Sequence, residues 1–145
     1  MNLTDALNYE PYLLYLGLEI VTAEPLEVTL RLPLRREVSN HLGLAHGGAQ
    51  YGLGEATAIA LATMLFHDRQ RRLNALTAQA AIVYHRRAGG SLLAHAAMPA
   101  AEATRLRATL DEQGKVRFLA LVEIADETRS LATSLTVECV VMVSQ

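Results

Sequence analysis

The stretch HGGAQYGLGEATAIALATMLF, residues 46–66, decides the fold. It is apolar on nearly every side, and Glu55 is its only charged residue after His46. A helix without a polar face must be enclosed by other elements. The sequence therefore predicts one long buried helix from about Gly48 to Phe66.

A membrane offers the other way to enclose such a helix. The apolar part, 49–66, has eighteen residues, which is marginal for crossing a bilayer. A glutamate near the middle of a lone spanning helix is costly. We therefore expect burial inside protein and no contact with a membrane.

Most of the remaining chain alternates between apolar and polar residues, clearly so along 26–32, 116–124 and 131–141. This period is typical of strands with one buried face. Before the first strand we expect a helix, Thr4–Leu16, ended by Gly17. The expected strands are Leu18–Ala23, Leu26–Leu32, Thr77–Arg86, Ser91–Ala100, Thr104–Asp111, Lys115–Ala125 and Leu131–Val143.

Short connections fix how these strands pair. Gly89-Gly90 and Glu112-Gln113-Gly114 are typical of hairpin turns. Consecutive strands joined by short turns pair antiparallel, because parallel pairs need long crossovers. The sequence predicts an α+β fold in one domain, residues 1–145. A mainly antiparallel sheet of five to six strands is expected to wrap around the long buried helix.

Composition narrows the function. Thirteen Lys and Arg against fifteen Asp and Glu give a formal charge of −2, so the broad basic field that nucleic-acid binding needs is absent. The single cysteine, Cys139, lies in an apolar run, and we expect a buried thiol in the reducing cytoplasm. The histidines lack metal-ligand spacing, so no metal is expected. They are His41, His46, His67, His85 and His95.

The residues suited to chemistry gather at the start of the long helix. A helix N-terminus offers unpaired N–H groups to an anion or a carbonyl oxygen, and Gly47 and Gly48 let a substrate approach them. Glu55 is a carboxylate among apolar neighbours, which is either paired, exposed at an opening or kept for reaction. Gly47 and Glu55 are eight residues apart, about 12 Å along a helix. Both can serve one carbonyl if two copies of the helix meet, which predicts a dimer.

The pattern Asn40-x5-His46-Gly47-Gly48-x6-Glu55-Ala56, on a long helix followed by strands, resembles the hotdog-fold thioesterases. It is similar to their PaaI-type and YiiD/DUF4442-type branches, over nearly the whole chain. The stretch 82–88 with Gly90 is a weaker match. The resemblance implies hydrolysis of an acyl-CoA or related thioester by a homodimer or a dimer of dimers. It implies no cofactor beyond the coenzyme A of the substrate.

The resemblance also assigns roles. Glu55 is the general base or nucleophile, the Gly47 N–H polarises the carbonyl, and Asn40 and His46 position substrate or water. Further substrate contacts are expected from Gly48, Tyr51, Thr57, Tyr84, Arg86 and Arg87. The acyl tunnel is expected to involve Leu53, Leu61, Tyr51 and Tyr84.

The chain departs from the family in three places. PaaI-type members more often have Asp where Glu55 stands. Some relatives carry a hydroxyl residue where Ile59 stands, so Thr57 or an ordered water is expected to hold the attacking water. Arg87 replaces a usual proline, which makes Arg86-Arg87 either a contact for the phosphates of coenzyme A or a solvated basic turn.

Two other functions stay open. A hotdog 3-hydroxyacyl dehydratase or hydratase also uses a helix carboxylate, but its Gly-His-Phe-Pro stretch is missing here. A non-catalytic acyl-binding protein would use Glu55 only to satisfy neighbouring polar groups.

Overall fold

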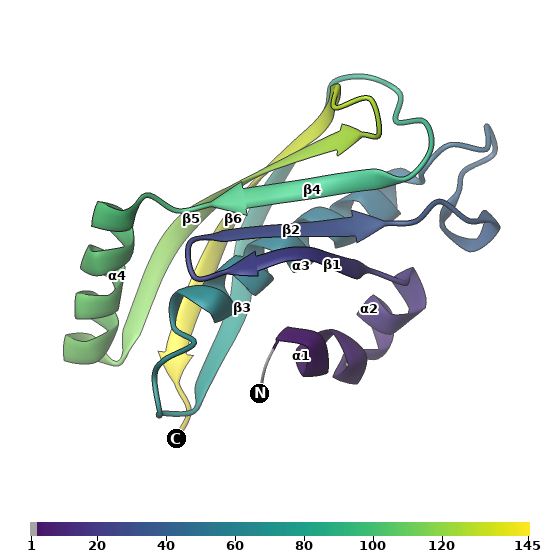
Figure 1. Ribbon diagram of the computed structural model, residues 1–145. Coiled ribbons are helices and arrows are strands. Elements are labelled where there is room, and N and C mark those ends of the chain that lie inside the picture. Colours follow the sequence, from purple (N-terminus) through teal and green to yellow (C-terminus); the bar gives the residue numbers. More distant parts are fainter. Residues whose placement is uncertain (1–2) are drawn as a thin grey trace.

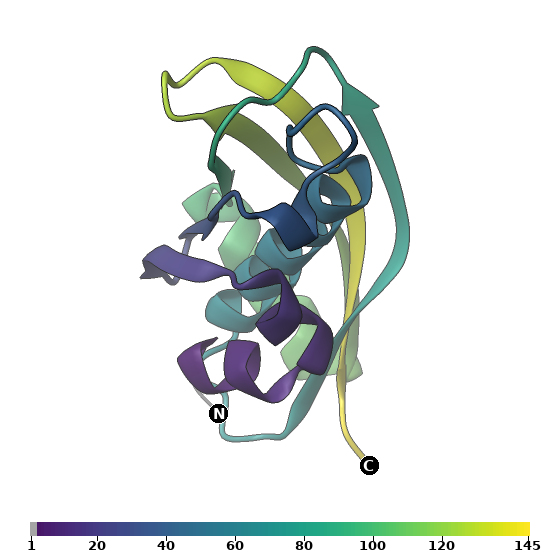
Figure 2. The same cartoon turned by 90° about the vertical axis from the view of Figure 1, so that its right-hand side faces the viewer.

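The apolar stretch forms a single helix, α3 (Gly47–Leu65), in the computed structural model, which describes residues 3–145. Twelve of its residues are buried, including Leu53, Leu61 and Leu65. A six-stranded sheet bends around this helix, as Figures 1 and 2 show from two directions. The predicted fold class is confirmed, and the architecture is the hotdog fold that the resemblance implies.

The sheet has the strand order β1-β2-β4-β5-β6-β3, and every neighbouring pair is antiparallel. Its inner face is apolar and packs on α3, because alternate residues of each strand point the same way. The strands are β1 (Glu19–Glu24), β2 (Glu27–Leu32), β3 (Leu73–Tyr84), β4 (Leu92–Ala97), β5 (Lys115–Asp126) and β6 (Leu131–Val143).

Two expected hairpin turns have other roles. Gly89-Gly90 follows β3, but β3 pairs with β6 while β4 pairs with β2 and β5. This connection therefore crosses the sheet. The Glu112-Gln113-Gly114 segment ends a helix, where Gly114 takes the left-handed conformation with φ of 72°. Glycine is favoured there because it lacks a Cβ atom.

The expected strand Thr104–Asp111 is wrong, because this segment lies in the helix α4 (Ala100–Gln113). Ala103, Leu106 and Leu110 share one face at helical spacing and are buried. Leu106 and Leu110 also fit an alternating pattern, which is why a strand could be expected. Arg107 Nε donates to the Leu65 carbonyl at the end of α3 over 2.8 Å, so α4 fixes that end of the central helix.

The expected first helix is divided in two: α1 (Leu3–Tyr9) and α2 (Pro11–Leu16). Glu10 separates them in extended conformation, because a proline disfavours helical geometry in the residue before it. Gly17 ends α2 with φ of 74°, as expected. Leu3, Leu7, Leu13 and Leu16 bury the inner side of both helices.

The central helix packs closely against the sheet at Gly54. A Cβ atom there would lie 2.5 Å from Cδ1 of Leu135 on β6. The neighbouring strand β3 contains a register shift between Thr77 and Gln79, where the ladder to β6 is interrupted. Such bulges redirect side chains locally. Thr77, the last paired residue of β3 before this shift, faces α3.

A short 3-10 helix, η1 (Arg36–Val38), precedes the loop that enters α3. Ser39 and Ala45 form an isolated bridge across that loop. The loop that enters α3 therefore has a defined conformation.

Candidate functional site

Glu55 lies half-buried on α3 and faces β3. The Thr77 hydroxyl donates a hydrogen bond of 2.9 Å to Glu55 Oε1. This contact fixes the carboxylate between the central helix and the edge strand. Thr77 was not among the expected site residues. Its strand position is visible in the sequence, but the contact between β3 and α3 is not.

A cavity of about 190 Å³ adjoins Glu55 where α1, α2, α3 and β3 meet. Its walls are mostly apolar, and Glu10 also lines it. Desolvation raises the pKa of Glu10, and the negative charge of Glu55 raises it further. Two carboxyl groups therefore share one apolar cavity, and Glu10 is held toward its protonated form.

Cys139 on β6 is fully buried beneath α3. Burial, together with the charge of Glu55, raises the pKa of its thiol to about 12. A thiol with this pKa stays protonated at neutral pH and is a poor nucleophile. Cys139 therefore contributes packing, as the sequence predicts.

The first residue of α3, Gly47, is about two helical turns from Glu55. The loop before α3 orders the polar groups at this end of the helix. His46 is the N-cap, and its Nδ1 accepts a 2.8 Å hydrogen bond from the Gly48 N–H. In the neutral ring the proton is then on Nε2. Gly47 is the first helical residue, so its N–H has no partner within the helix.

Tyr84 from β3 covers this end of α3. Its hydroxyl donates 2.8 Å to the Gly47 carbonyl oxygen. A Cβ atom on residue 47 would lie 3.2 Å from the Tyr84 hydroxyl, so glycine makes the close approach of the ring straightforward. The expected site residues Gly47, Gly48, His46 and Tyr84 are thus brought together.

Asn40 organises the loop itself. Its Oδ1 accepts hydrogen bonds from the N–H groups of Leu42 and Leu44 over 2.8 and 3.1 Å. Gln50 secures the first turn of α3 by donating to the Ala45 carbonyl oxygen and accepting from the Thr133 hydroxyl. Gln50 was not expected in the site, because nothing local in the sequence pairs it with β6.

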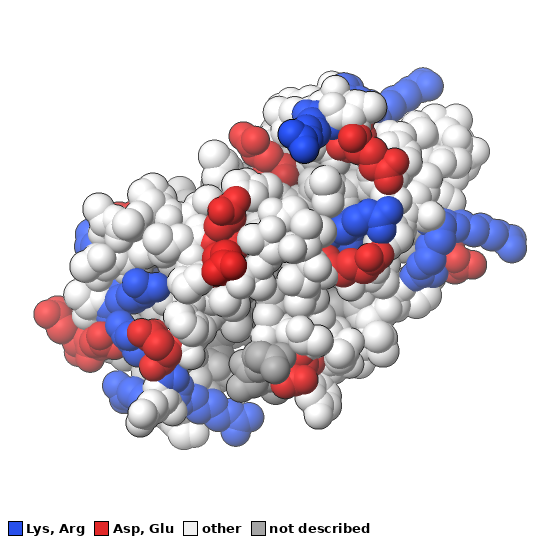
Figure 3. All heavy atoms as spheres, viewed as in Figure 1, with Lys and Arg blue, Asp and Glu red and all other residues white. Residues whose placement is uncertain are grey.

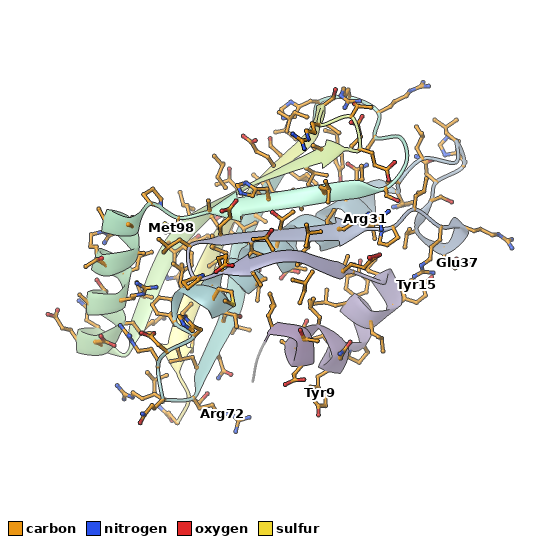
Figure 4. All side chains as sticks on the ribbon, in the orientation of Figure 1. Tyr9, Tyr15, Arg31, Glu37, Arg72 and Met98 are labelled. Atoms are coloured by element: carbon orange, nitrogen blue, oxygen red, sulfur yellow. The ribbon has the colours of Figure 1, made fainter. Side chains whose placement is uncertain are left out.

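An open groove of about 310 Å³ lies beside this end of α3. Tyr12 and Tyr15 of α2 line it together with Glu37, His46 and Gly48. Figure 4 shows Tyr15 and Glu37 close together at this edge of the molecule. The Arg35 guanidinium lies 5.3 Å from the centre of the Tyr15 ring. The groove and the Glu55 cavity have no lining residue in common.

Four other residues, expected to contact the substrate or to line its acyl tunnel, have different surroundings. The Thr57 hydroxyl is fully buried and donates 2.7 Å to the Leu53 carbonyl oxygen, so Thr77 supplies the hydroxyl beside Glu55 instead. Tyr51 is partly exposed on α3 and lines neither cavity. Leu53 and Leu61 are fully buried in the core and also line neither.

Arg86 is engaged within the fold. It donates 2.7 Å to Asp126 Oδ2 and also binds the carbonyl oxygens of Ser130 and Leu131. The Thr128 hydroxyl and the Arg86 guanidinium, together with the N–H groups of Ser130 and Thr128, hold the pKa of Asp126 well below its usual range. Arg86 thereby fastens the β5–β6 turn to the end of β3, while Arg87 is exposed.

The charges on the face seen in Figure 3 are interspersed, with no continuous basic area. Within residues 3–145 no group of three or more His, Cys, Asp or Glu side chains could hold a metal ion. In the same residues, none of the helices combines the length and the apolar character needed to cross a membrane.

The model of a domain of unknown function, DUF4442, matches residues 4–141. The chain belongs to the DUF4442 family. No curated protein matches this DUF4442 sequence.

Solved structures share the fold of this chain. A Pseudomonas aeruginosa protein of unknown function, described as a probable thioesterase, is 23% identical. It has a TM-score of 0.80, with 95% of this chain and 92% of that chain covered. A Chlorobaculum tepidum protein of unknown function is 16% identical and has a TM-score of 0.89, with 98% and 93% covered. A thioesterase family protein from Silicibacter pomeroyi is 16% identical at a TM-score of 0.76, with 98% and 96% covered.

At these identities the likeness establishes the fold of this DUF4442 chain. It is a thioesterase-like hotdog fold.

Proposed function

We propose that the protein hydrolyses thioesters, with an acyl-CoA or a related thioester as substrate and Glu55 as the reacting carboxylate. The observation that carries this proposal is the position of Glu55 in a mostly apolar cavity, held through one oxygen by Thr77. Burying a carboxylate among apolar groups opposes folding, and such placement is typical of groups that react. Structural neighbours named as thioesterases support the same chemistry.

The chemistry requires one proton acceptor and one group that stabilises the oxyanion. As general base, Glu55 takes a proton from water, whose oxygen adds to the thioester carbonyl carbon. The tetrahedral intermediate then expels the thiolate of coenzyme A, which recovers the proton. As nucleophile, a Glu55 carboxylate oxygen adds to the thioester carbonyl carbon and the C–S bond breaks, which releases the thiolate of coenzyme A and leaves an anhydride that water hydrolyses. The thioester carbonyl oxygen receives a hydrogen bond from the Gly47 N–H in either case.

Within one chain, the Glu55 carboxylate and the Gly47 N–H are far apart. Gly47 and Glu55 lie about 12 Å apart along α3, and the cavity beside Glu55 shares no lining residue with the groove beside Gly48. The proposal therefore uses two chains around a two-fold axis, with Glu55 of one chain facing Gly47 of the other. His46 and Asn40 then hold the loop that presents Gly47, and Tyr84 and Gly48 adjoin it.

The edge strand β3 is suited to such a contact. Among the described strands it has only β6 as a neighbour, so its other edge is open over twelve residues. Leu76 and Val83 on this strand are 56% and 53% exposed. Open strand edges with apolar side chains favour pairing with another chain. Leu119 and Leu121 on β5, 65% and 61% exposed, offer a second contact for a dimer of dimers.

Coenzyme A enters only as part of the substrate. Arg87 is available to its phosphates, whereas Arg86 is committed to Asp126 and neighbouring carbonyl groups.

The decisive experiment measures thiol release from acetyl-, hexanoyl-, decanoyl-, palmitoyl- and phenylacetyl-CoA. Wild type, Glu55→Gln and the matched control Glu112→Gln are compared. Glu112 is exposed near the end of α4, away from the cavity. We expect turnover by wild type and Glu112→Gln, and a loss of at least 100-fold in Glu55→Gln, as for removal of a general base. Unchanged turnover in Glu55→Gln would overturn the role of Glu55.

Two other results would replace the proposal. Saturable binding of an acyl-CoA without thiol release would identify an acyl-binding protein. Loss of water from a 3-hydroxyacyl-CoA, followed by absorbance of the enoyl product, would identify a dehydratase.

A further inference from the structure

The Glu55 cavity is closed by the two N-terminal helices. Leu3 and Leu7 of α1 and Leu13 of α2 line it, and Leu3 and Leu7 are only 6% and 8% exposed. They are one helical turn apart and point inward together. These side chains form an apolar wall in front of α3.

The cavity is elongated along the central helix. Its α3 lining begins at Glu55 and reaches Thr63, a span of about 12 Å at the helical rise. The N-terminal helices run along α3 in the opposite sense. Leu16 contacts α3 at Gly52, and Glu10 is close enough to Glu55 to feel its charge. Leu7 and Leu3 therefore lie further along, toward Thr63 and away from the reacting carboxylate.

The volume sets the size of an occupant. An apolar cavity of roughly 150 Å³ accepts benzene. The present cavity, about 190 Å³, has room for a group of about six to eight carbon atoms.

Resting on the thioester hydrolysis proposed above, we propose that this cavity holds the acyl group and that Leu7 and Leu3 of α1 limit its length. The substrate class is then thioesters of medium acyl chains, or phenyl-substituted acyl groups, of about six to eight carbons. The carbonyl lies at the Glu55 end and the apolar tail points toward α1. Longer chains meet the Leu7 and Leu3 side chains.

The test alters the wall in both directions. Leu7→Ala lengthens the cavity, and Ala6→Leu, from the same helix and lining, shortens it. Leu14→Ala is the matched control, because Leu14 is 61% exposed on α2 and lines neither the Glu55 cavity nor the groove at the start of α3. The value of kcat/KM is measured for straight-chain acyl-CoAs from acetyl to palmitoyl and for phenylacetyl-CoA.

We expect a wild-type optimum at six to eight carbons. Leu7→Ala moves it about two carbons longer and raises kcat/KM for the longer chains about fourfold per methylene that gains burial. Ala6→Leu moves it shorter, and Leu14→Ala leaves it unchanged. If Leu7→Ala fails to fold, Ala6→Leu alone tests the wall. A palmitoyl optimum in wild type, or the same optimum in all variants, overturns the inference.

A binding measurement separates this inference from the proposed function. The same acyl-CoA series is titrated calorimetrically into Glu55→Gln, alone and combined with Leu7→Ala or Ala6→Leu. The acyl chain length that binds most tightly is compared between the variants. A change of this length in the wall variants supports the cavity as the acyl site even if wild type releases no thiol. If the protein releases thiol but its chain-length preference is the same in wild type, Leu7→Ala and Ala6→Leu, the proposed function is supported and the inference is overturned.

Discussion

The Thr77 hydroxyl on β3 donates to Glu55 Oε1 on α3 over 2.9 Å. This hydrogen bond joins the edge strand to the central helix at the carboxylate that we propose reacts. It orients one carboxylate oxygen, and both residues line the same cavity.

Replacing Thr77 by Val should reduce turnover more than stability. The isosteric side chain keeps the packing but removes the donor, so Glu55 loses its fixed orientation. We expect kcat to fall about tenfold with KM nearly unchanged, and the free energy of unfolding to fall by about 1 kcal/mol. Thr77→Ser should restore most of the activity. Wild-type kcat in Thr77→Val would show that the contact serves only the fold.

Mixing two inactive variants should restore activity if the site is shared between chains. Glu55→Gln removes the carboxylate, and Gly47→Pro removes the N–H at the first helical position, where proline is tolerated. His46 before it is already extended, with ψ of 139°, as a residue before proline requires. Refolding equal amounts together should recover about a quarter of wild-type activity, because half the dimers contain one intact site of two. A mixture as inactive as its components would place both groups of each site in one chain.

Glu10→Gln should stabilise the protein at neutral pH but much less in acid. The pKa of Glu10 is raised in the folded protein above its usual value near 4.5, so folding holds this proton more tightly than the unfolded chain does. Its contribution to stability is complete below pH 4.5 and is lost as the pH rises through the raised pKa. Glutamine does not ionise and avoids that loss.

The measurement is the difference in Tm between Glu10→Gln and wild type at pH 4 and pH 7.5. The difference should be more positive at pH 7.5. Glu112→Gln, on the exposed side of α4, provides the comparison. An equal difference at both pH values would contradict the raised pKa of Glu10.

Gly54→Ala should destabilise the fold more than Gly52→Ala. The new methyl at 54 would meet three atoms of Leu135 at 2.5 to 3.1 Å, and Leu135 is fixed in the core. At 52 it would press mainly on one methyl of Leu16, at 2.7 Å, on the short helix α2. Overpacking of this kind costs about 1–3 kcal/mol. Urea denaturation should show this loss for Gly54→Ala and a smaller one for Gly52→Ala; equal values would mean that α3 can shift away from β6.

Cys139 should not react with thiol reagents in the native state. It is fully buried and its pKa is raised to about 12, so the thiolate that reacts is scarce and enclosed. A disulfide reagent should modify less than a tenth of the chains in an hour without denaturant, and nearly all in urea. Rapid modification of native protein would mean that the β6 side of α3 opens. An inert thiol also keeps the thiol-release assay free of background.

The sequence predicted the framework well where patterns are local and strong. The apolar run after His46 has no polar face, so a buried helix follows directly. Alternation gave the strands around it. It failed at 104–111, because Leu106 and Leu110 satisfy both periods, and the helix-forming residues from Ala100 onward outweigh the alternation.

The sequence by itself determined the buried helix and indicated two candidate functional residues on it: a glycine at its start and a carboxylate eight residues on. Only the tertiary structure decided their surroundings. Thr77 meets Glu55, Gln50 meets β6 and the N-terminal helices close the cavity through contacts between segments distant along the chain. Arg86, a surface cation in the sequence, is tied to Asp126 for the same reason. Residue periodicity reports which side of an element is buried, whereas these contacts depend on which elements pack together.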